Sequence, residues 1–141
     1  MLKEATHKYR VERTEVPLLK NFIEEHLRNW GVEEQCLQDI ILAADEAATN
    51  IVEHGYKNIE NKQNKVFTLT LKKEKNTVEV ILEDEGQAFE PNKAPKPNIK
   101  LNLTGKRRGG FGVFLMNALM DKIKYSQRGG KNLMCMIKKI P

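Results

Sequence analysis

The chain has 141 residues, of which 40% are hydrophobic and 30% charged, a composition typical of one folded domain with its own core. No apolar run approaches the roughly 20 residues of a membrane-spanning helix, and no signal peptide follows Met1, so we expect a cytoplasmic protein without a membrane anchor. Cys36 and Cys135 lack the spacing of a metal site or a disulfide framework, and we expect both to be reduced thiols.

The net charge of +5 comes from a single segment. Residues 91–120 contain six basic side chains and no acidic one, whereas the rest of the chain carries 18 basic and 19 acidic residues. A basic nucleic-acid-binding protein usually spreads its positive charge over a face or along a helix. One cationic loop fits a small polyanion equally well, for example the phosphates of a nucleotide. Composition alone favours a solvated, flexible loop.

The first half of the chain is predicted to contain one strand and two helices. Mixed polar and apolar residues over 6–16 favour an edge strand. Pro17 suits the first turn of a helix, and apolar residues then recur at helical spacing until Gly31. A second helix is predicted over 33–54, closed by Gly55. Its apolar stripe consists of Leu37, Ile40, Ile41, Ala44, Ala48, Ile51 and Val52.

The second half is predicted to contain more strands than helices. Alternating patterns predict strands at 66–71, 78–82, 123–126 and 133–137. Lys75-Asn76 and Gly129-Gly130 are the turns of two antiparallel hairpins, and a third helix begins near Gly110. The order of elements predicts an α+β sandwich over residues 1–141, with helices on one face of a mostly antiparallel sheet.

Three groups of residues are candidates for chemistry, and the first lies on the second predicted helix. Glu46, Asn50 and His54 are four residues apart, which aligns them along one side of the helix. A carboxylate can act as a general base, and carboxylate or carboxamide oxygens are ligands that Mg²⁺ prefers. Taken alone, this spacing is more typical of a solvated helix face. His54 could orient Glu46 or cap the C-terminus of the helix, and the second role is favoured.

The second group follows the strand at 78–82 and reads Glu83-Asp84-Glu85-Gly86. A carboxylate at a strand end can accept a hydrogen bond from an exocyclic amine such as that of adenine. Gly86 would let the backbone pass close to a flat ring. In isolation the segment is more typical of an acidic turn.

The third group, residues 107–112, reads Arg-Arg-Gly-Gly-Phe-Gly at the start of the third predicted helix. Glycines there leave backbone N–H groups unobstructed, and a helix N-terminus favours phosphate. The segment is not a P-loop, because Arg107 follows Gly105-Lys106 where Ser or Thr is required. It is not a Rossmann fingerprint either, because a basic loop precedes it rather than a strand.

Taken together and in this order, the three groups resemble the nucleotide-binding boxes of the GHKL ATPase superfamily. Within that superfamily the chain is similar to the RsbW-like anti-sigma-factor serine kinases of bacterial partner-switching systems, from about Tyr9 to the end. The most distinctive stretches are DEAATNIVEHGY at 45–56, EDEGQAFEP at 83–91 and RRGGFGVFLMNALMDKIKY at 107–125. The resemblance implies a two-layer sandwich of the GHKL (Bergerat) type.

The resemblance also implies a role for each box. Glu46 would activate the attacking hydroxyl or water, and Asn50 would hold Mg²⁺ between the phosphates of ATP. Asp84 would bind the adenine amine, with Gly86 beside the ring. The third box would wrap the phosphates with Gly109, Gly110, Phe111, Gly112 and Val113. Residues 91–108 would form the ATP lid, whose candidates for neutralising phosphate charge are Lys106, Arg107 and Arg108.

The function implied by the resemblance is that of an ATP-dependent protein serine/threonine kinase and anti-sigma factor. Such a protein phosphorylates a STAS-type anti-sigma-factor antagonist, binds a sigma factor and forms a homodimer, without contacting nucleic acid directly. The alternative is an ATP-binding docking module of the same fold with little or no kinase activity. A nucleic-acid-binding protein is disfavoured, because the positive charge clusters beside the third box.

The chain departs from the family in one place. Members often carry an arginine at the start of the first helix that serves substrate recognition. Here that neighbourhood reads Glu15-Val16-Pro17, and Arg13 falls in the predicted strand. The identity of the protein partner therefore stays open.

Overall fold

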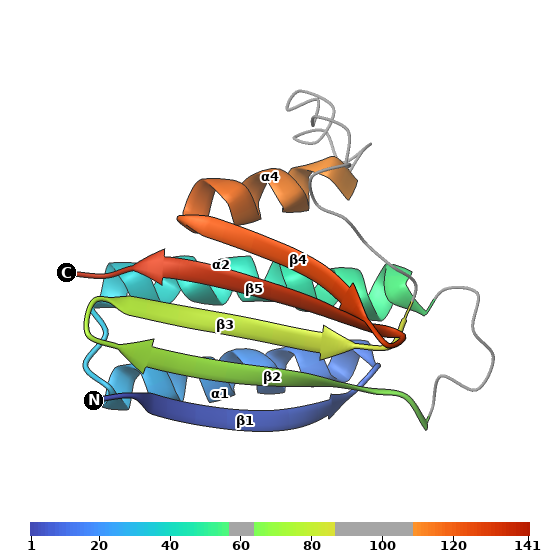
Figure 1. Cartoon of the computed structure of the whole chain (residues 1–141), viewed down its shortest axis with the longest axis horizontal. Helices are drawn as coiled ribbons and strands as arrows, with labels where there is room; N and C mark the ends of the chain where they lie inside the picture. Colours follow the sequence, from blue (N-terminus) through green and yellow to red (C-terminus); the bar gives the residue numbers. More distant parts are fainter. Residues whose placement is uncertain (57–63, 87–108) are drawn as a thin grey trace.

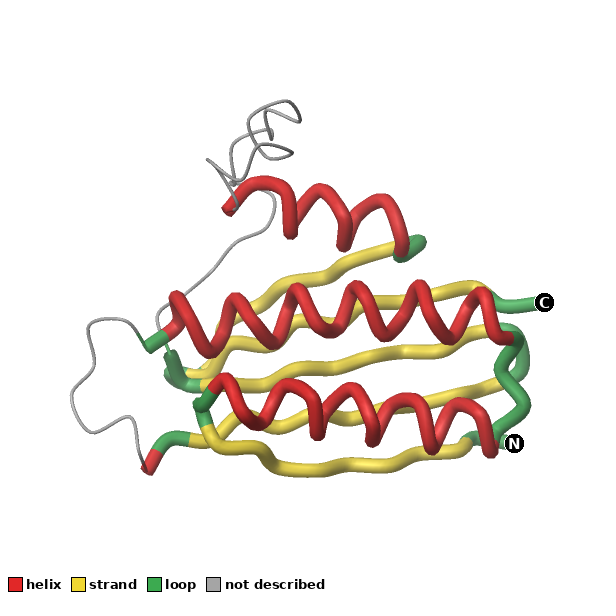
Figure 2. Tube along the Cα trace, turned by 180° about the vertical axis from the view of Figure 1, so that it is seen from behind, coloured by secondary structure: helices red, strands yellow, loops and turns green. Residues whose placement is uncertain are grey.

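The computed structural model describes residues 1–56, 64–86 and 109–141. Within these ranges five strands form one sheet in the order β1-β2-β3-β5-β4, and all neighbouring strands are antiparallel. The strands are β1 (Lys3–Arg10), β2 (Val66–Glu74), β3 (Thr77–Asp84), β4 (Lys122–Arg128) and β5 (Lys131–Lys139). The helices α1 (Val16–Asn29), α2 (Glu34–Asn50) and α4 (Gly109–Leu119) cover one face of this sheet (Figures 1 and 2). The predicted α+β sandwich is confirmed.

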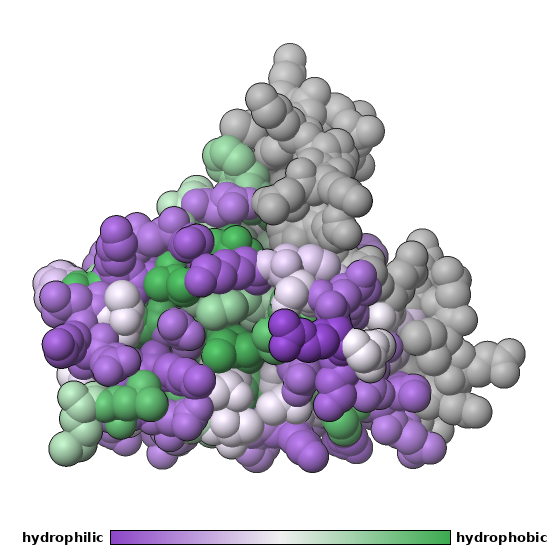
Figure 3. Space-filling view, in the orientation of Figure 1, coloured by the Kyte–Doolittle hydropathy of each residue, from purple (hydrophilic) through white to green (hydrophobic). Residues whose placement is uncertain are grey.

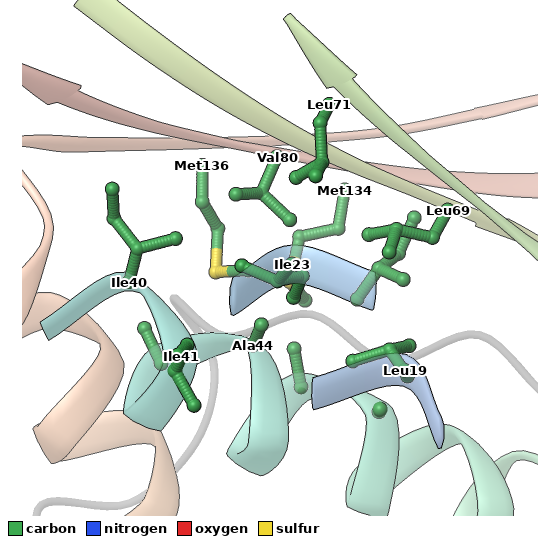
Figure 4. Close-up of a cluster of buried hydrophobic side chains, with 14 of the residues drawn as sticks. Leu19, Ile23, Ile40, Ile41, Ala44, Leu69, Leu71, Val80, Met134 and Met136 are labelled. Carbon is green, nitrogen blue, oxygen red and sulfur yellow. The ribbon is translucent and has the colours of Figure 1, made fainter. Parts of the chain in front are cut away.

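The core fills the layer between the sheet and the helices (Figure 4). Strand alternation and helical spacing both direct apolar side chains into this layer, where burial of each Leu or Ile contributes about 1.5–3 kcal/mol. The central helix α2 buries alanines at four positions, and such small side chains allow close packing. Buried residues from the five packed elements include Leu19, Ile23, Ile40, Ala44, Leu69, Leu71, Val80 and Met136.

The first predicted strand is wrong at its boundaries. Strand β1 ends at Arg10, and Arg13–Glu15 form a short 3-10 turn that leads into α1. Arg13 therefore lies at the start of the first helix rather than in a strand. Its guanidinium pairs with the carboxylate of Glu53 at 3.0 Å, which joins this turn to the residues that follow α2.

The second predicted helix also ends differently. The α-helical hydrogen-bonding pattern stops at Asn50, and Ile51–Gly55 form a π-helical turn. Apolar spacing does not distinguish this wider turn from a further α-helical turn, so the sequence pattern ran on to His54. Turns of this kind are frequent at functional sites. Here the turn is followed directly by Tyr56, whose side chain is fully buried.

Both predicted hairpin turns are confirmed. Lys75 has a φ of 48°, and Gly129 and Gly130 have φ values of 59° and 78°, the left-handed backbone that tight turns require. The strands they join are longer than the sequence pattern indicated. Most of the predicted loop at 57–65 and the whole predicted lid at 91–108 lie outside the described residues.

The sheet has one end at which both chain termini lie and an opposite end at which β3 finishes and β5 begins (Figure 1). The face without helices mixes charged side chains with apolar ones (Figure 3). No helix in the described ranges is long and apolar enough to cross a membrane.

Candidate functional site

A pocket opens where the end of α2 meets the ends of β3 and β5, on the side away from the chain termini. Asn50 and Asp84, which belong to two separate sequence motifs, both line it. The surroundings of these two polar groups are mainly apolar, a combination that suits a flat ring with a polar edge. The lining residues are Ala47, Asn50, Ile51, Gly55, Leu82, Asp84, Tyr125, Asn132 and Met134.

Asp84 is the last of the inward-facing residues on β3 and comes directly after Leu82 in that series. Its carboxylate therefore lies in the buried layer between the sheet and the helices. The residue is 8% exposed. Its Oδ1 accepts hydrogen bonds from the backbone N–H of Gly86 at 2.8 Å and from Nδ2 of Asn132 at 3.1 Å. Burial raises the pKa of Asp84, and these two hydrogen bonds act in the opposite direction. The result is a buried carboxylate with one oxygen already engaged.

Gly86 packs against the π-helical turn. A Cβ atom at this position would lie 2.5 Å from the carbonyl oxygen of Gly55 and 2.8 Å from the ring of Tyr56. The hydroxyl of Tyr56 in turn accepts a hydrogen bond from the N–H of Glu85 at 2.9 Å. Glycine is therefore required here by protein packing, in addition to any contact with a ligand.

Glu46 lies beside the first turn of α4. A Cβ at Gly112 would approach Oε2 of Glu46 to 2.6 Å, so the glycine leaves room for the carboxylate. The structure thus brings the first and third sequence motifs together. Both Gly112 and Val113 are buried there, whereas the position of His54 is exposed.

Asn50 has an unusual environment. Its side-chain nitrogen Nδ2 is buried without a hydrogen-bond partner among the described residues, which is a costly arrangement for a polar group. A carboxamide can supply one oxygen ligand to Mg²⁺, which commonly binds through one or two protein oxygens together with substrate phosphates. In the described ranges, no three His, Cys, Asp or Glu side chains cluster to hold a metal by themselves. The side-chain oxygen of Asn50 could supply one such ligand, and the unpartnered Nδ2 could only donate a hydrogen bond.

The remaining predicted residues belong to the third box. Gly109, Gly110 and Phe111 form the first turn of α4, as the sequence motif indicates. Lys106, Arg107 and Arg108 lie outside the described residues.

The sequence analysis assigned no role to three residues of the site, Asn132, Tyr125 and Tyr56. Tyr56 and Tyr125 each end one of the quoted stretches, whereas Asn132 lies outside all of them. Asn132 begins the inward-facing series that continues with Met134 and Met136, and it is 4% exposed. A polar residue in that alternating series is the signal that could have identified it. The predicted strand began only at Leu133 and so left Asn132 in the turn.

Comparison with known proteins identifies the family of the chain. The profile of a family described as the histidine kinase-like ATPase domain matches residues 10–138. The chain belongs to this family. Among relatives in the histidine kinase-like ATPase domain family, the serine/threonine-protein kinase BtrW of Bordetella bronchiseptica is 32% identical over 93 residues, 66% of this chain and 63% of that protein. The serine-protein kinase RsbW of Halalkalibacterium halodurans is 30% identical over 103 residues, 67% of this chain and 57% of that protein.

These relatives confirm the resemblance to the RsbW-like group, and the matches span about three fifths of their length. Two solved structures share the fold of this histidine kinase-like ATPase domain. The RsbU and RsbW domains of Rv1364c from Mycobacterium tuberculosis match with a TM-score of 0.68 and 15% identity, over 98% of this chain and 32% of that chain. The SiaB–SiaC complex from Pseudomonas aeruginosa matches with a TM-score of 0.61 and 12% identity, over 96% and 89%.

Proposed function

We propose that the chain is an ATP-dependent protein serine/threonine kinase that acts as an anti-sigma factor in a bacterial partner switch. The observation that carries the proposal is the convergence of Asn50 and Asp84 on one pocket, with Glu46 against the glycine-rich start of α4. The similarity to proteins named serine-protein kinases supports it. The protein would work in the cytoplasm.

In this proposal the pocket binds the nucleotide base, and Asp84 is the group that recognises it. Both described hydrogen bonds to its carboxylate end on Oδ1. Oδ2 is then the acceptor for the adenine amine. Asn50 would hold Mg²⁺, which neutralises phosphate charge when bound. The basic side chains Lys106, Arg107 and Arg108 would neutralise the remaining charge.

Glu46 is the proposed general base. It would accept the proton from a serine or threonine hydroxyl of the partner protein as that oxygen bonds to the γ-phosphorus and ADP leaves. Gly112 would keep this carboxylate at the start of α4, where backbone N–H groups favour the phosphates of the nucleotide. The protein contributes mainly position and charge to such a reaction.

We further propose that a STAS-type antagonist contacts the start of α1 and that a sigma factor is bound when the antagonist is not. Arg13 lies at this helix start, beside a groove between α1 and α2. The groove is lined by Arg13, Val16, Pro17, Lys20, Asp45, Thr49, Val52 and Glu53. A homodimer is also part of the proposal, and light scattering of the purified protein would measure it.

The test is transfer of phosphate from labelled Mg·ATP to a candidate STAS-type protein. Glu46→Gln should abolish transfer and preserve ATP affinity, because glutamine keeps the size of the side chain and cannot accept the proton. The control is Glu25→Gln on the exposed face of α1, which should transfer phosphate like the unmodified protein. A Glu46→Gln variant that still phosphorylates its partner would refute this role for Glu46. Partner regulation without any phosphorylation by the unmodified chain would favour the docking module.

A further inference from the structure

Asn132 lies opposite Asp84 in the sheet. The antiparallel register of β3 and β5 pairs these two residues directly, and both face the buried layer. Each stands at the site end of its strand, next to the pocket that both of them line. The next inward-facing residues of β5, Met134 and Met136, are apolar. The carboxamide of Asn132 therefore occupies a position at which the alternating pattern of β5 predicts a hydrophobic side chain.

The carboxamide of Asn132 is fully engaged within the protein. Its Nδ2 donates to Oδ1 of Asp84 at 3.1 Å and to the carbonyl oxygen of Gly86 at 2.8 Å. Its Oδ1 accepts from the hydroxyl of Tyr125 at 3.2 Å and from Nε2 of Gln127 at 2.9 Å. The two donors on β4 fix which way the amide faces, because they require an acceptor on their side. The N–H groups are thus directed at Asp84 and Gly86.

We propose that Asn132 is a positioning residue that sets the base specificity of this pocket: it holds Asp84 by Oδ1, so that Oδ2 is presented to the exocyclic amine of an adenine nucleotide. The inference rests on the proposed ATP site and adds a determinant that the sequence motifs do not contain. Asn132 acts through Asp84 and Gly86, because its own donors and acceptor are already used.

The geometry favours this role over a purely structural one. A buried amide is costly unless all of its hydrogen bonds are made, and a hydrophobic residue at the same position would pack without that requirement. The network also links three strands through the carboxamide of Asn132 on β5, which donates to Asp84 on β3 and accepts from Tyr125 on β4. Rotation of the Asp84 side chain would break the bond from Asn132, so the network opposes it.

The experiment compares the affinities of ATP and purine riboside 5′-triphosphate, which lacks only the 6-amino group. The unmodified protein should prefer ATP by about tenfold or more, the usual effect of one hydrogen bond to a charged group. Asn132→Leu should lose most of this preference, through weaker ATP binding with little change for the analogue. The control is Met136→Leu, a volume-conserving change two inward positions further along β5, which should keep the preference.

A folded Asn132→Leu variant that keeps the preference, or that loses affinity for both nucleotides equally, would overturn the inference. Should this variant fail to fold, Tyr125→Phe combined with Gln127→Ala removes both donors to Oδ1 of Asn132, and an unchanged preference there would overturn it as well. If the unmodified protein binds neither nucleotide, or binds both equally, the proposed adenine site itself fails. A preference retained in the unmodified protein and in Asn132→Leu alike refutes only the role of Asn132.

Discussion

Two opposing effects act on the pKa of Asp84: its burial raises the pKa, and its hydrogen bonds lower it. Burial raises its pKa above the ordinary value of 3.8, so the folded chain binds this proton more readily than the unfolded chain does. Stability then decreases as the pH rises from about 3.8 through the raised pKa. At neutral pH the ionised carboxylate therefore lowers stability, which is consistent with a residue retained for binding rather than for folding.

Asp84→Asn should exchange base preference without loss of stability. The amide oxygen can still accept from Gly86 and Asn132, whereas an NH₂ group replaces the acceptor that faces the pocket. ATP affinity should fall about tenfold to a hundredfold, and binding of inosine triphosphate, which carries an oxygen in place of the amine, should improve. Calorimetric titration with both nucleotides measures this, and thermal unfolding at pH 7 should give a melting temperature no lower than that of the unmodified protein. Retained ATP affinity would contradict the role of Asp84.

Gly112 and Gly86 should respond differently to alanine. At Gly112 the new Cβ meets the flexible end of Glu46, so the fold should survive while the carboxylate is displaced, lowering phosphotransfer about a hundredfold. At Gly86 the Cβ meets the backbone of Gly55, which cannot move as easily, and stability should fall by about 1–3 kcal/mol. Urea unfolding and phosphotransfer rates of the two variants separate the effects. Equal losses of stability would show that displacing the Glu46 side chain costs as much as displacing the backbone of Gly55.

At the scale of elements, Lys138 joins α2, α4 and β5. Its Nζ lies 3.3 Å from Oδ2 of Asp39 on α2 and donates to the carbonyl oxygen of Leu119 at the last residue of α4. The two charged side chains are only 16% and 22% exposed. A cation that caps a helix C-terminus also interacts favourably with the helix dipole. This contact anchors the end of α4 that lies away from Glu46.

Lys138→Met should lower the free energy of unfolding by about 1–3 kcal/mol, since it removes a charge-assisted hydrogen bond and leaves Asp39 without its cation. The matched control is Lys72→Met, which breaks the more exposed pair with Glu4, where the N···O distance is 3.6 Å, and should cost no more than about 0.5–1 kcal/mol. Urea unfolding measures both variants. Equal effects would mean that the anchor of α4 lies elsewhere.

The elements were largely predictable because apolar spacing is a local property. It predicted the helices, the hairpins and the layer that they form. The spacing of apolar residues does not distinguish an α-helical turn from a π-helical turn, which is why the π-helical turn after Asn50 was not predicted. Glu46, Asn50 and Asp84 were chosen as candidates through motifs that are contiguous in sequence. Asn132 was not, because its partner is 48 residues away and only the register of β3 with β5 brings the two together.

At the scale of the whole molecule, the pocket draws on α2, the π-helical turn and three strands. A ligand bound there would contact elements from both halves of the chain, so its binding free energy should raise the free energy of unfolding of the whole domain. At a nucleotide concentration of one hundred times Kd this amounts to about 2.7 kcal/mol.

Mg·ATP should therefore raise the melting temperature, by about 5–10 °C at that degree of saturation. ATP with a chelator should give a smaller shift, because the phosphates then lack the metal that Asn50 is proposed to hold. In Asn50→Leu the shifts with and without Mg²⁺ should be equal. Differential scanning fluorimetry measures all four combinations. A full magnesium effect in Asn50→Leu would assign the metal to other residues.

Both termini lie at the end of the sheet opposite to the one where β3 finishes at Asp84 (Figure 1), which has a practical consequence for immobilisation. A biotin or an affinity handle added at either terminus would attach the molecule to a sensor surface by the end of the sheet that lies opposite the pocket. The pocket and the start of α4 would then face the flowing solution. Association and dissociation of nucleotides should consequently be the same whichever terminus carries the handle.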